Sequence, residues 1–213
     1  MKNVILILLF ICPISIFSQE NSYLFTNNNA LKISVFEFGK AEFQLSYERF
    51  FNDRKSSLSI IPSIILENDN ETNKEGWSIM SQYRFYLTHF NKQHANTFLG
   101  FENYALYTGL YGSYLDYVED YSIMDWNESQ QDYTTEEHRK DLSAVEAGAL
   151  IGMQINFSKR VLLDIYIGGG IKKTDLNDSY DGDEYSYYNS YSVFDREYEG
   201  VKPRLGFQLG FNF

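Results

Sequence analysis

Hydrophobic and polar residues alternate with a period of two along most of this chain, and the alternation is cleanest over residues 200–213, GVKPRLGFQLGFNF. Successive side chains of a β-strand point to opposite faces, so this pattern predicts a closing strand with one apolar face and one polar or bare face. The apolar parity of this strand comprises Val201, Pro203, Leu205, Phe207, Leu209, Phe211 and Phe213.

The same alternation predicts seven earlier strands, which are separated by clusters of turn residues. They cover residues 30–38, 41–51, 57–66, 77–87, 97–117, 141–157 and 160–173. Pro62 predicts a bulge or a local irregularity in the third of these strands, because proline cannot donate to a β-ladder. The alternation of apolar and polar residues is irregular near Glu102 and Asn103. This predicts either a bulge or a strand that extends well beyond a membrane.

Short and long connections alternate between the predicted strands. With the N-terminus on the inner side of a membrane, the short connections 52–55, 89–93 and 158–159 become inner turns. The long connections 67–75, 118–140 and 174–199 become outer loops, and 39–40 is an unusually short outer connection. Short inner turns and long outer loops are typical of transmembrane barrels.

We therefore predict an all-β fold, an eight-stranded antiparallel up-and-down transmembrane β-barrel with long acidic outer loops, over residues 19–213. After residue 18 no segment approaches eighteen apolar residues, so a membrane would be crossed by strands, which satisfy their backbone groups in lipid as a closed barrel. A soluble barrel of lipocalin type is the main alternative. Such a barrel needs a polar exterior, whereas the polar faces predicted here are rich in glycine and serine.

Residues 1–18 are predicted to be a secretory signal peptide, with Lys2, an apolar run over 4–11, and cleavage between Ser18 and Gln19. Cys12 leaves a lipid anchor as the alternative, although Ile11 stands where a small residue is expected. Without Lys2 and Cys12 the mature chain has no cysteine, and 17 basic residues face 29 acidic ones, a net charge of −12. The lack of cysteine excludes disulfides, and the acidic charge balance argues against nucleic acid as a partner.

The chain resembles the small eight-stranded bacterial outer-membrane proteins of the OmpA, OmpX and OmpW type. The resemblance lies in the alternating strands, in DIYIGGG at 164–170 and in the closing GFQLGFNF, and DIYIGGGIK is also similar to a segment of an uncharacterised barrel family. It implies location in the bacterial outer membrane and contact with its lipid and lipopolysaccharide. A terminal aromatic strand also resembles the insertion signal read by the barrel-assembly machinery, here Leu205, Phe207, Leu209, Phe211 and Phe213.

Charged residues of both signs collect on the inward parities of the predicted strands. An eight-stranded barrel is only wide enough for its own side chains, so we expect these charges to pair and to form a structural plug. A narrow pore for ions or small solutes is the alternative. The predicted plug comprises Glu42, Glu48, Arg84, Glu146, Asp164, Lys172, Lys202 and Arg204, with Lys32 beside them.

Candidate catalytic and metal-binding residues are sparse. A lipid-modifying outer-membrane enzyme would need a histidine beside a serine and an orienting acid. His89 and His94 fall at a predicted inner turn and His138 falls in a predicted outer loop, so we predict no catalytic residue. The segment 175–184, DLNDSYDGDE, has Tyr180 where an EF-hand loop needs glycine, so we predict no metal or cofactor, with a weak divalent-cation site as the alternative.

The predicted outer loops have the most unusual composition. Residues 119–141 hold eight acids and two bases, and residues 175–199 hold eight acids with Arg196 as their one base. Tyrosine gives a large contact area at a small entropic cost, which suits protein recognition. We therefore predict a structural or adhesive role in which the loops bind a surface protein. The predicted loop surface comprises Trp126, Tyr133, Tyr185, Tyr187, Tyr188 and Tyr191.

Overall fold

The computed structural model describes residues 28–35, 37, 41–68, 72–87, 104–127, 132–158, 160–179, 192–193 and 195–213. The predictions for the signal peptide, for the connection 39–40, for the turn 89–93 and for the parity around Glu102 and Asn103 lie outside these residues. In the part of the chain that the structure describes, no helix is long and apolar enough to cross a membrane.

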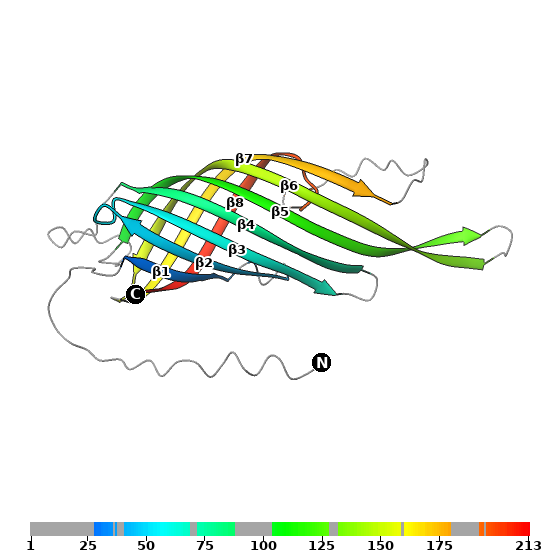
Figure 1. Ribbon diagram of the computed structural model, residues 1–213, viewed down its shortest axis with the longest axis horizontal. Coiled ribbons are helices and arrows are strands. Elements are labelled where there is room, and N and C mark those ends of the chain that lie inside the picture. The colour runs from blue at the N-terminus through cyan, green and yellow to red at the C-terminus, as the bar shows by residue number, and fades with distance from the viewer. Residues whose placement is uncertain are drawn as a thin grey trace, which may run out of the picture.

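Eight antiparallel strands form a single closed sheet, in which each strand pairs with its sequence neighbours and the first pairs with the last (Figure 1). Both the fold class and the strand order predicted from the sequence are confirmed. The strands are β1 Asn29–Ser34, β2 Glu42–Phe51, β3 Ser56–Asn68, β4 Thr72–Tyr86, β5 Tyr104–Asn127, β6 Asp132–Asn156, β7 Val161–Asp178 and β8 Gly200–Asn212.

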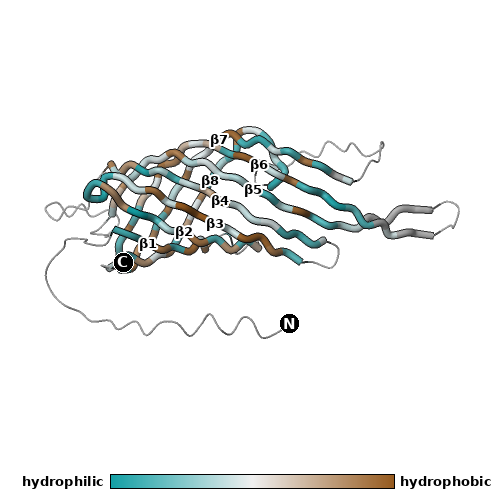
Figure 2. The backbone as a smooth tube through the Cα atoms, viewed as in Figure 1, coloured by the Kyte–Doolittle hydropathy of each residue, from teal (hydrophilic) through white to brown (hydrophobic). Residues whose placement is uncertain are grey.

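The two ends of the barrel differ. The end that holds the turn 52–55, the turn between β6 and β7 and the C-terminus is called the turn end. At the opposite end, called the ribbon end, β5 and β6 extend far past the other strands (Figure 1). Figure 2 shows hydrophobic residues concentrated around the barrel, and hydrophilic residues on β5 and β6 where these strands leave the barrel, before their grey ends.

The predicted parity is confirmed along the strands. In β2, for example, Gln44, Ser46 and Glu48 are buried inside the barrel, whereas Phe43 and Tyr47 are exposed on its outside. The interior is not purely polar, because aromatic and aliphatic side chains share the inward parity. The larger interior cluster comprises Ala30, Phe50, Ile61, Met80, Tyr86, Ala105, Tyr107, Tyr111, Leu150, Leu162 and Tyr166.

The predicted long polar loop 118–140 is wrong, because β5 and β6 remain paired from Tyr104↔Ile155 out to Asn127↔Asp132. Residues 122–127 and 132–138 are therefore paired strands rather than a loop, and we call the segment between Ser122 and His138 the ribbon. β-branched and aromatic residues such as Tyr121, Ile123 and Tyr133 favour strands, and cross-strand pairing satisfies the backbone of an otherwise polar sequence. The other outer connections are also shorter than the loops predicted from the sequence. β3 ends at Asn68 and β4 begins at Thr72, and β7 ends at Asp178.

Pro62 causes a local irregularity but not a bulge. The β3–β4 register runs unbroken through Pro62↔Ile79. On the other edge, pairing with β2 stops after Gln44↔Ser63 and resumes at Tyr47↔Ile60 in the same register. The hydrogen bond from Leu66 N to Ala41 O shows that even-numbered residues of β3 face β2, so the N–H that proline lacks belongs to this edge.

The predicted turn 52–55 is confirmed, and it also closes the turn end of the barrel. Asn52, Asp53 and Arg54 have φ values of 50°, 54° and 62°, and Lys55 N donates to Asn52 O at 3.0 Å. This left-handed path returns Arg54 beneath the barrel, where its guanidinium carbon lies 4.3 Å from the centre of the Phe50 ring. The Arg54 side chain is buried as a result.

Glycine makes room for interior tyrosine rings at two places. A Cβ atom on Gly206 of β8 would overlap the ring of Tyr166 on β7, and a Cβ on Gly152 of β6 would overlap the ring of Tyr107 on β5. Glycine is unfavourable within strands in general, so its presence here indicates close approach of a neighbour. The rings of Tyr166 and Tyr107 thereby occupy the space that side chains at Gly206 and Gly152 would take, and both rings are buried.

We predict that Gly206→Ala lowers the free energy of unfolding by ~1–3 kcal/mol, because the new methyl group must displace the packed Tyr166 ring. Gly112→Ala is the matched control, since a Cβ there meets only Glu146 O at 3.9 Å. Urea titration of both variants refolded in lipid vesicles measures the difference. Equal stabilities would show that Tyr166 can move without cost.

Candidate functional site

Four charged side chains meet in the middle of the barrel, and none of them is exposed to solvent. The Lys32 ammonium on β1 contacts the carboxylates of both Glu48 on β2 and Asp164 on β7. On the opposite wall, Arg84 of β4 contacts the same two carboxylates, with Nη1 at 2.5 Å from Asp164 Oδ2 and 3.4 Å from Glu48 Oε1. These four residues are called the central network.

Neutral side chains satisfy the remaining polar atoms of the central network. Gln82 Oε1 accepts from Arg84 Nε at 2.9 Å and from Nη2 at 2.6 Å. Tyr107 OH donates to Asp164 Oδ1 at 2.6 Å, and Tyr86 OH donates to Glu48 Oε1 at 2.9 Å. Every charge in the network is thus both ion-paired and hydrogen-bonded, as buried charges require.

The central network is electrically balanced and spans the lumen. Two cations and two anions from β1, β2, β4 and β7 contact one another across the barrel. The Arg84 guanidinium also lies over the Tyr107 ring, with Cζ 4.5 Å from the ring centroid. Removing one partner would leave an uncompensated charge in a fully buried site, which is far more costly than losing a surface ion pair.

A second ion pair lies closer to the ribbon end. Arg204 of β8 binds Glu146 of β6 through two hydrogen bonds, Nε to Oε1 at 3.2 Å and Nη2 to Oε2 at 2.6 Å. Tyr111 OH donates to the same carboxylate at 2.6 Å, and the Arg204 guanidinium lies over the Tyr111 ring. This fork-to-fork geometry fixes both side chains against the wall.

The eight residues predicted as one plug therefore occupy separate levels of the barrel. Glu48, Arg84 and Asp164 form the central network with Lys32, and Glu146 pairs with Arg204 above it. Lys172, Lys202 and Glu42 lie nearer the ribbon end and contact a chain segment that the sequence analysis had assigned to a loop. The strand tilt and stagger of a barrel bring residues distant in sequence to one level, which inward parity alone does not reveal.

That segment, residues 195–199, runs from the β7–β8 connection across the barrel mouth, and we call it the cap. Lys172 Nζ donates to Arg196 O, and Lys202 Nζ donates to Asp195 O at 2.9 Å. The Arg196 guanidinium lies 3.9 Å from Glu42 and 3.7 Å from Glu67. Arg196 is the only base among the eight acids of 175–199, and this isolation is the sequence signal that could have identified it.

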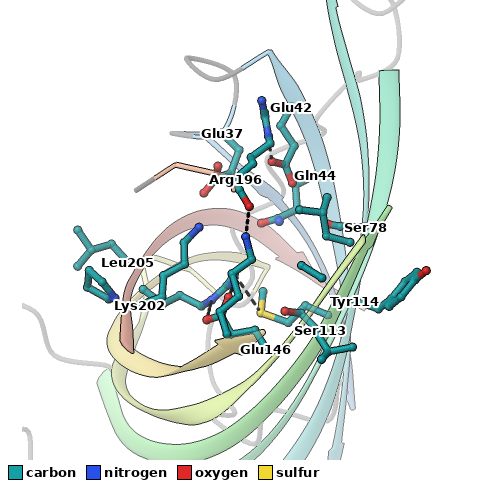
Figure 3. A pocket seen from close by; sticks show the side chains of 17 residues that line it. Glu37, Glu42, Gln44, Ser78, Ser113, Tyr114, Glu146, Arg196, Lys202 and Leu205 are labelled. Carbon is teal, nitrogen blue, oxygen red and sulfur yellow. Dashed lines mark hydrogen bonds and ion pairs between the residues drawn. The ribbon is translucent and has the colours of Figure 1, made fainter. Parts of the chain in front are cut away.

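A cavity of about 320 Å³ lies between the cap and the Glu146–Arg204 pair. Figure 3 shows Arg196 and Glu42 at one end of this cavity and Glu146 at the other, with Lys202 at its side. Polar groups from β2, β4 and β5, namely Gln44, Ser78 and Ser113, line the opposite wall. Basic, acidic and neutral hydrogen-bonding groups therefore line one partly open cavity.

The apolar parity of β8 lies on the outside of the barrel. Leu205, Leu209, Phe211 and Phe213 are between 44% and 59% exposed, and Phe207 is partly exposed. The strand pairs with β7 along its length and with β1 at its end. These positions leave the side chains accessible, and their role as an insertion signal remains a prediction.

The predicted loop-surface residues divide into two groups. Trp126 and Tyr133 are paired directly across the ribbon, so they belong to strands β5 and β6 rather than to a loop. The other four, Tyr185, Tyr187, Tyr188 and Tyr191, lie outside the described residues.

The structure also corrects the position of His138, which was predicted in an outer loop. It lies in β6 opposite Tyr121, and the two ring centroids are 5.7 Å apart. His89 and His94 lie outside the described residues, as do residues 180–184 of the segment 175–184. Within the described part of the chain, no group of three or more His, Cys, Asp or Glu side chains could hold a metal ion.

Comparison with known proteins adds little to this description. No protein-family model matches the chain, and no curated protein matches it. Among solved structures, it is similar to the N-terminal β-barrel domain of Pseudomonas aeruginosa OprF, with 12% identity and a TM-score of 0.40 over 88% of this chain and 98% of that domain. The class stated here, a closed eight-stranded antiparallel barrel, follows from the strand pairing itself.

We predict that Arg84→Ala destabilises the barrel by ~3–5 kcal/mol, because it strands the carboxylates of Glu48 and Asp164 in the interior. The control is Arg139→Ala, which removes an ion pair whose side chains are 60% and 49% exposed and should cost at most about 1 kcal/mol. Unfolding titrations in vesicles measure both variants. A small effect of Arg84→Ala would mean that water enters the central network.

Proposed function

We propose that the protein is a bacterial outer-membrane β-barrel whose role is non-enzymatic. The observation that supports membrane insertion is the continuous apolar exterior, since every strand carries large exposed hydrophobic side chains. A soluble barrel of lipocalin type would bury this face and show a polar one to water. Here the polar face is the buried one, with Lys32, Glu48, Arg84 and Asp164 at its centre.

The height of the apolar exterior matches a bilayer. Along β4 and the residue that follows it, the exposed outward residues run from Leu87, past Phe85 and Tyr83, to Trp77. Ten residues at ~3.3 Å each, tilted by ~40°, rise about 25 Å along the barrel axis, the height of the apolar band of outer-membrane barrels. At the edge of this apolar band nearest the ribbon end, the ring centroids of Trp77 and Tyr114 are 5.5 Å apart, as expected of an interfacial aromatic girdle.

We predict that Ile165→Arg lowers the stability of the vesicle-inserted protein by ~2–4 kcal/mol, because it places a charge at mid-membrane depth. Asp175→Arg is the control on the same outward parity of β7. Asp175 is exposed and lies beyond Ile171, the last large apolar residue on this parity, so its replacement should cost about 0–1 kcal/mol. Equal effects at the two positions would argue against membrane insertion of this face.

We further propose that the barrel is a closed scaffold rather than a pore. The central network and the surrounding tyrosines fill the lumen, and Arg54 covers its turn end. The expected result in a planar bilayer is therefore an absence of steady current through the unmodified protein. Sustained open-channel current would favour the alternative, a narrow pore for ions or small solutes.

The ribbon is the part of the molecule best placed to bind a partner. β5 has 24 residues and β6 has 25, whereas ~9–11 residues suffice for a tilted strand to cross a bilayer. Five acids and no lysine or arginine lie between Ser122 and His138. We propose that the ribbon binds a basic segment of a protein at the cell surface, because like-charged segments of a second copy would repel it.

The backbone of the ribbon supports binding by strand addition. β4 pairs with β5 only as far as Thr72↔Tyr121. The bond from Leu87 N to Leu106 O shows that even-numbered residues of β5 direct their backbone groups towards β4. Since the register is unbroken, the backbone groups of Ser122, Met124 and Trp126 face the edge beyond β4, where an extended peptide could pair with them.

We predict that replacing residues 122–137 by Asn-Gly abolishes binding of a peptide of alternating lysine and threonine, while the barrel still inserts. Tyr121 and His138 are directly opposite in the register, so a two-residue type I′ turn can join them. Calorimetry in detergent micelles measures binding, and heat-resistant gel mobility measures folding. Binding retained by the shortened protein would place recognition outside the ribbon.

Met124→Pro separates strand addition from simple charge attraction. This change removes an edge-facing N–H while leaving the acids and the ladder with β6 in place. Weaker peptide binding by about tenfold or more is expected if the edge is used. Unchanged affinity would indicate charge attraction alone.

A further inference from the structure

The cavity beneath the cap differs in charge from the rest of the protein. Four basic side chains and three acidic ones line it, which gives a local charge of +1 in a chain whose net charge is −11. The basic members are Lys172, Arg196, Lys202 and Arg204, and the acidic members are Glu37, Glu42 and Glu146. The cavity therefore holds more basic than acidic side chains, although the chain as a whole is acidic.

Three of the basic groups come from two adjacent strands and share one wall. Lys172 is on β7, and Lys202 and Arg204 are on β8, with Lys172 directly beside that strand through the pair Lys172↔Gly200. Lys172 is only 3% exposed. The Arg204 guanidinium forms the floor, where it binds Glu146 and keeps a side-chain exposure of 23%.

Backbone carbonyls of the cap accept hydrogen bonds from both lysines. The Lys172 ammonium donates to Arg196 O, and the Lys202 ammonium donates to Asp195 O at 2.9 Å. A carbonyl carries only a partial charge, whereas an ionised oxygen gives a shorter and stronger hydrogen bond to an ammonium group. Two adjacent carbonyl oxygens held between two ammonium groups occupy the positions that the oxygens of a bound anion would take.

We propose that this cavity is a binding site for a phosphate group carried by a small solute. Lys172 and Lys202 would bind its oxygens, and Arg204 would add charge from below. The cap carbonyls occupy the same positions when the solute is absent. A volume of about 320 Å³ accommodates a small phosphate-bearing molecule, and Gln44, Ser78 and Ser113 offer hydrogen bonds to its remainder.

Binding would then compete with the cap. The cap is held on the far side of the mouth by Arg196, which lies 3.7 Å from Glu67 and 3.9 Å from Glu42. Weakening this attachment should favour the phosphate, whereas removing a lysine should disfavour it. The proposal therefore predicts effects of opposite sign from two changes, which a purely structural role of these residues would not produce.

The test is calorimetric titration of the full-length folded protein in detergent micelles with inorganic phosphate, at constant ionic strength set by chloride. Lys172→Gln should weaken phosphate binding by about tenfold or more, the factor expected for one charge-assisted hydrogen bond. Lys202→Gln should have the same effect and serves as the second variant if the first does not fold. Heat-resistant gel mobility establishes folding in each case.

Glu67→Gln supplies the change of opposite sign, because it weakens the hold on Arg196 without altering a residue that lines the cavity. We expect it to tighten phosphate binding. Glu75→Gln is the matched control: Glu75 lies next to Lys74, the partner of Glu67 in the β3–β4 register, and should leave the affinity unchanged. No saturable phosphate binding to the parent, equal affinity in the parent and both lysine variants, or equal effects of Glu67→Gln and Glu75→Gln would each overturn the proposal.

Discussion

Closure of the sheet between β1 and β8 is the interaction on which the other features depend. Five residue pairs, from Ala30↔Asn212 to Ser34↔Gln208, join the two ends of the chain into one ring. Closure turns the polar face of every strand into the wall of a narrow lumen and leaves the apolar face outside. Charged side chains buried in that lumen are removed from bulk solvent, so they must neutralise one another, as Lys32, Glu48, Arg84 and Asp164 do.

The two halves of the lumen differ in their balance of charged side chains. Towards the turn end the central network balances two cations against two anions, and tyrosines and glutamines satisfy their remaining atoms. Towards the ribbon end the charges do not balance, and backbone carbonyls of the cap complete the coordination of Lys172 and Lys202. The balanced central network stabilises the fold. The unbalanced charges lie next to the cap, the segment that we propose a phosphate-bearing solute displaces.

Local patterns were sufficient wherever a strand has one apolar face. The parity of β2, β4, β7 and β8 predicted which side chains lie inside, because the period of two is a property of the strand itself. The same reasoning failed for residues 118–140, where polar residues on both faces resemble a loop. Only the paired partner strand satisfies that backbone, and pairing between Asn127 and Asp132 depends on the register set further down the barrel.

By itself the sequence determined the barrel class, the number and order of its strands and the set of charged residues that point inward. The tertiary structure decided which of those charges meet, because strand tilt brings Lys32 to Asp164 across 132 residues of sequence and separates both from Lys172. It also decided that Arg196 lies over the barrel mouth and that residues 119–127 and 132–137 form paired strands rather than a loop. Those placements depend on contacts between distant strands, which no local pattern encodes.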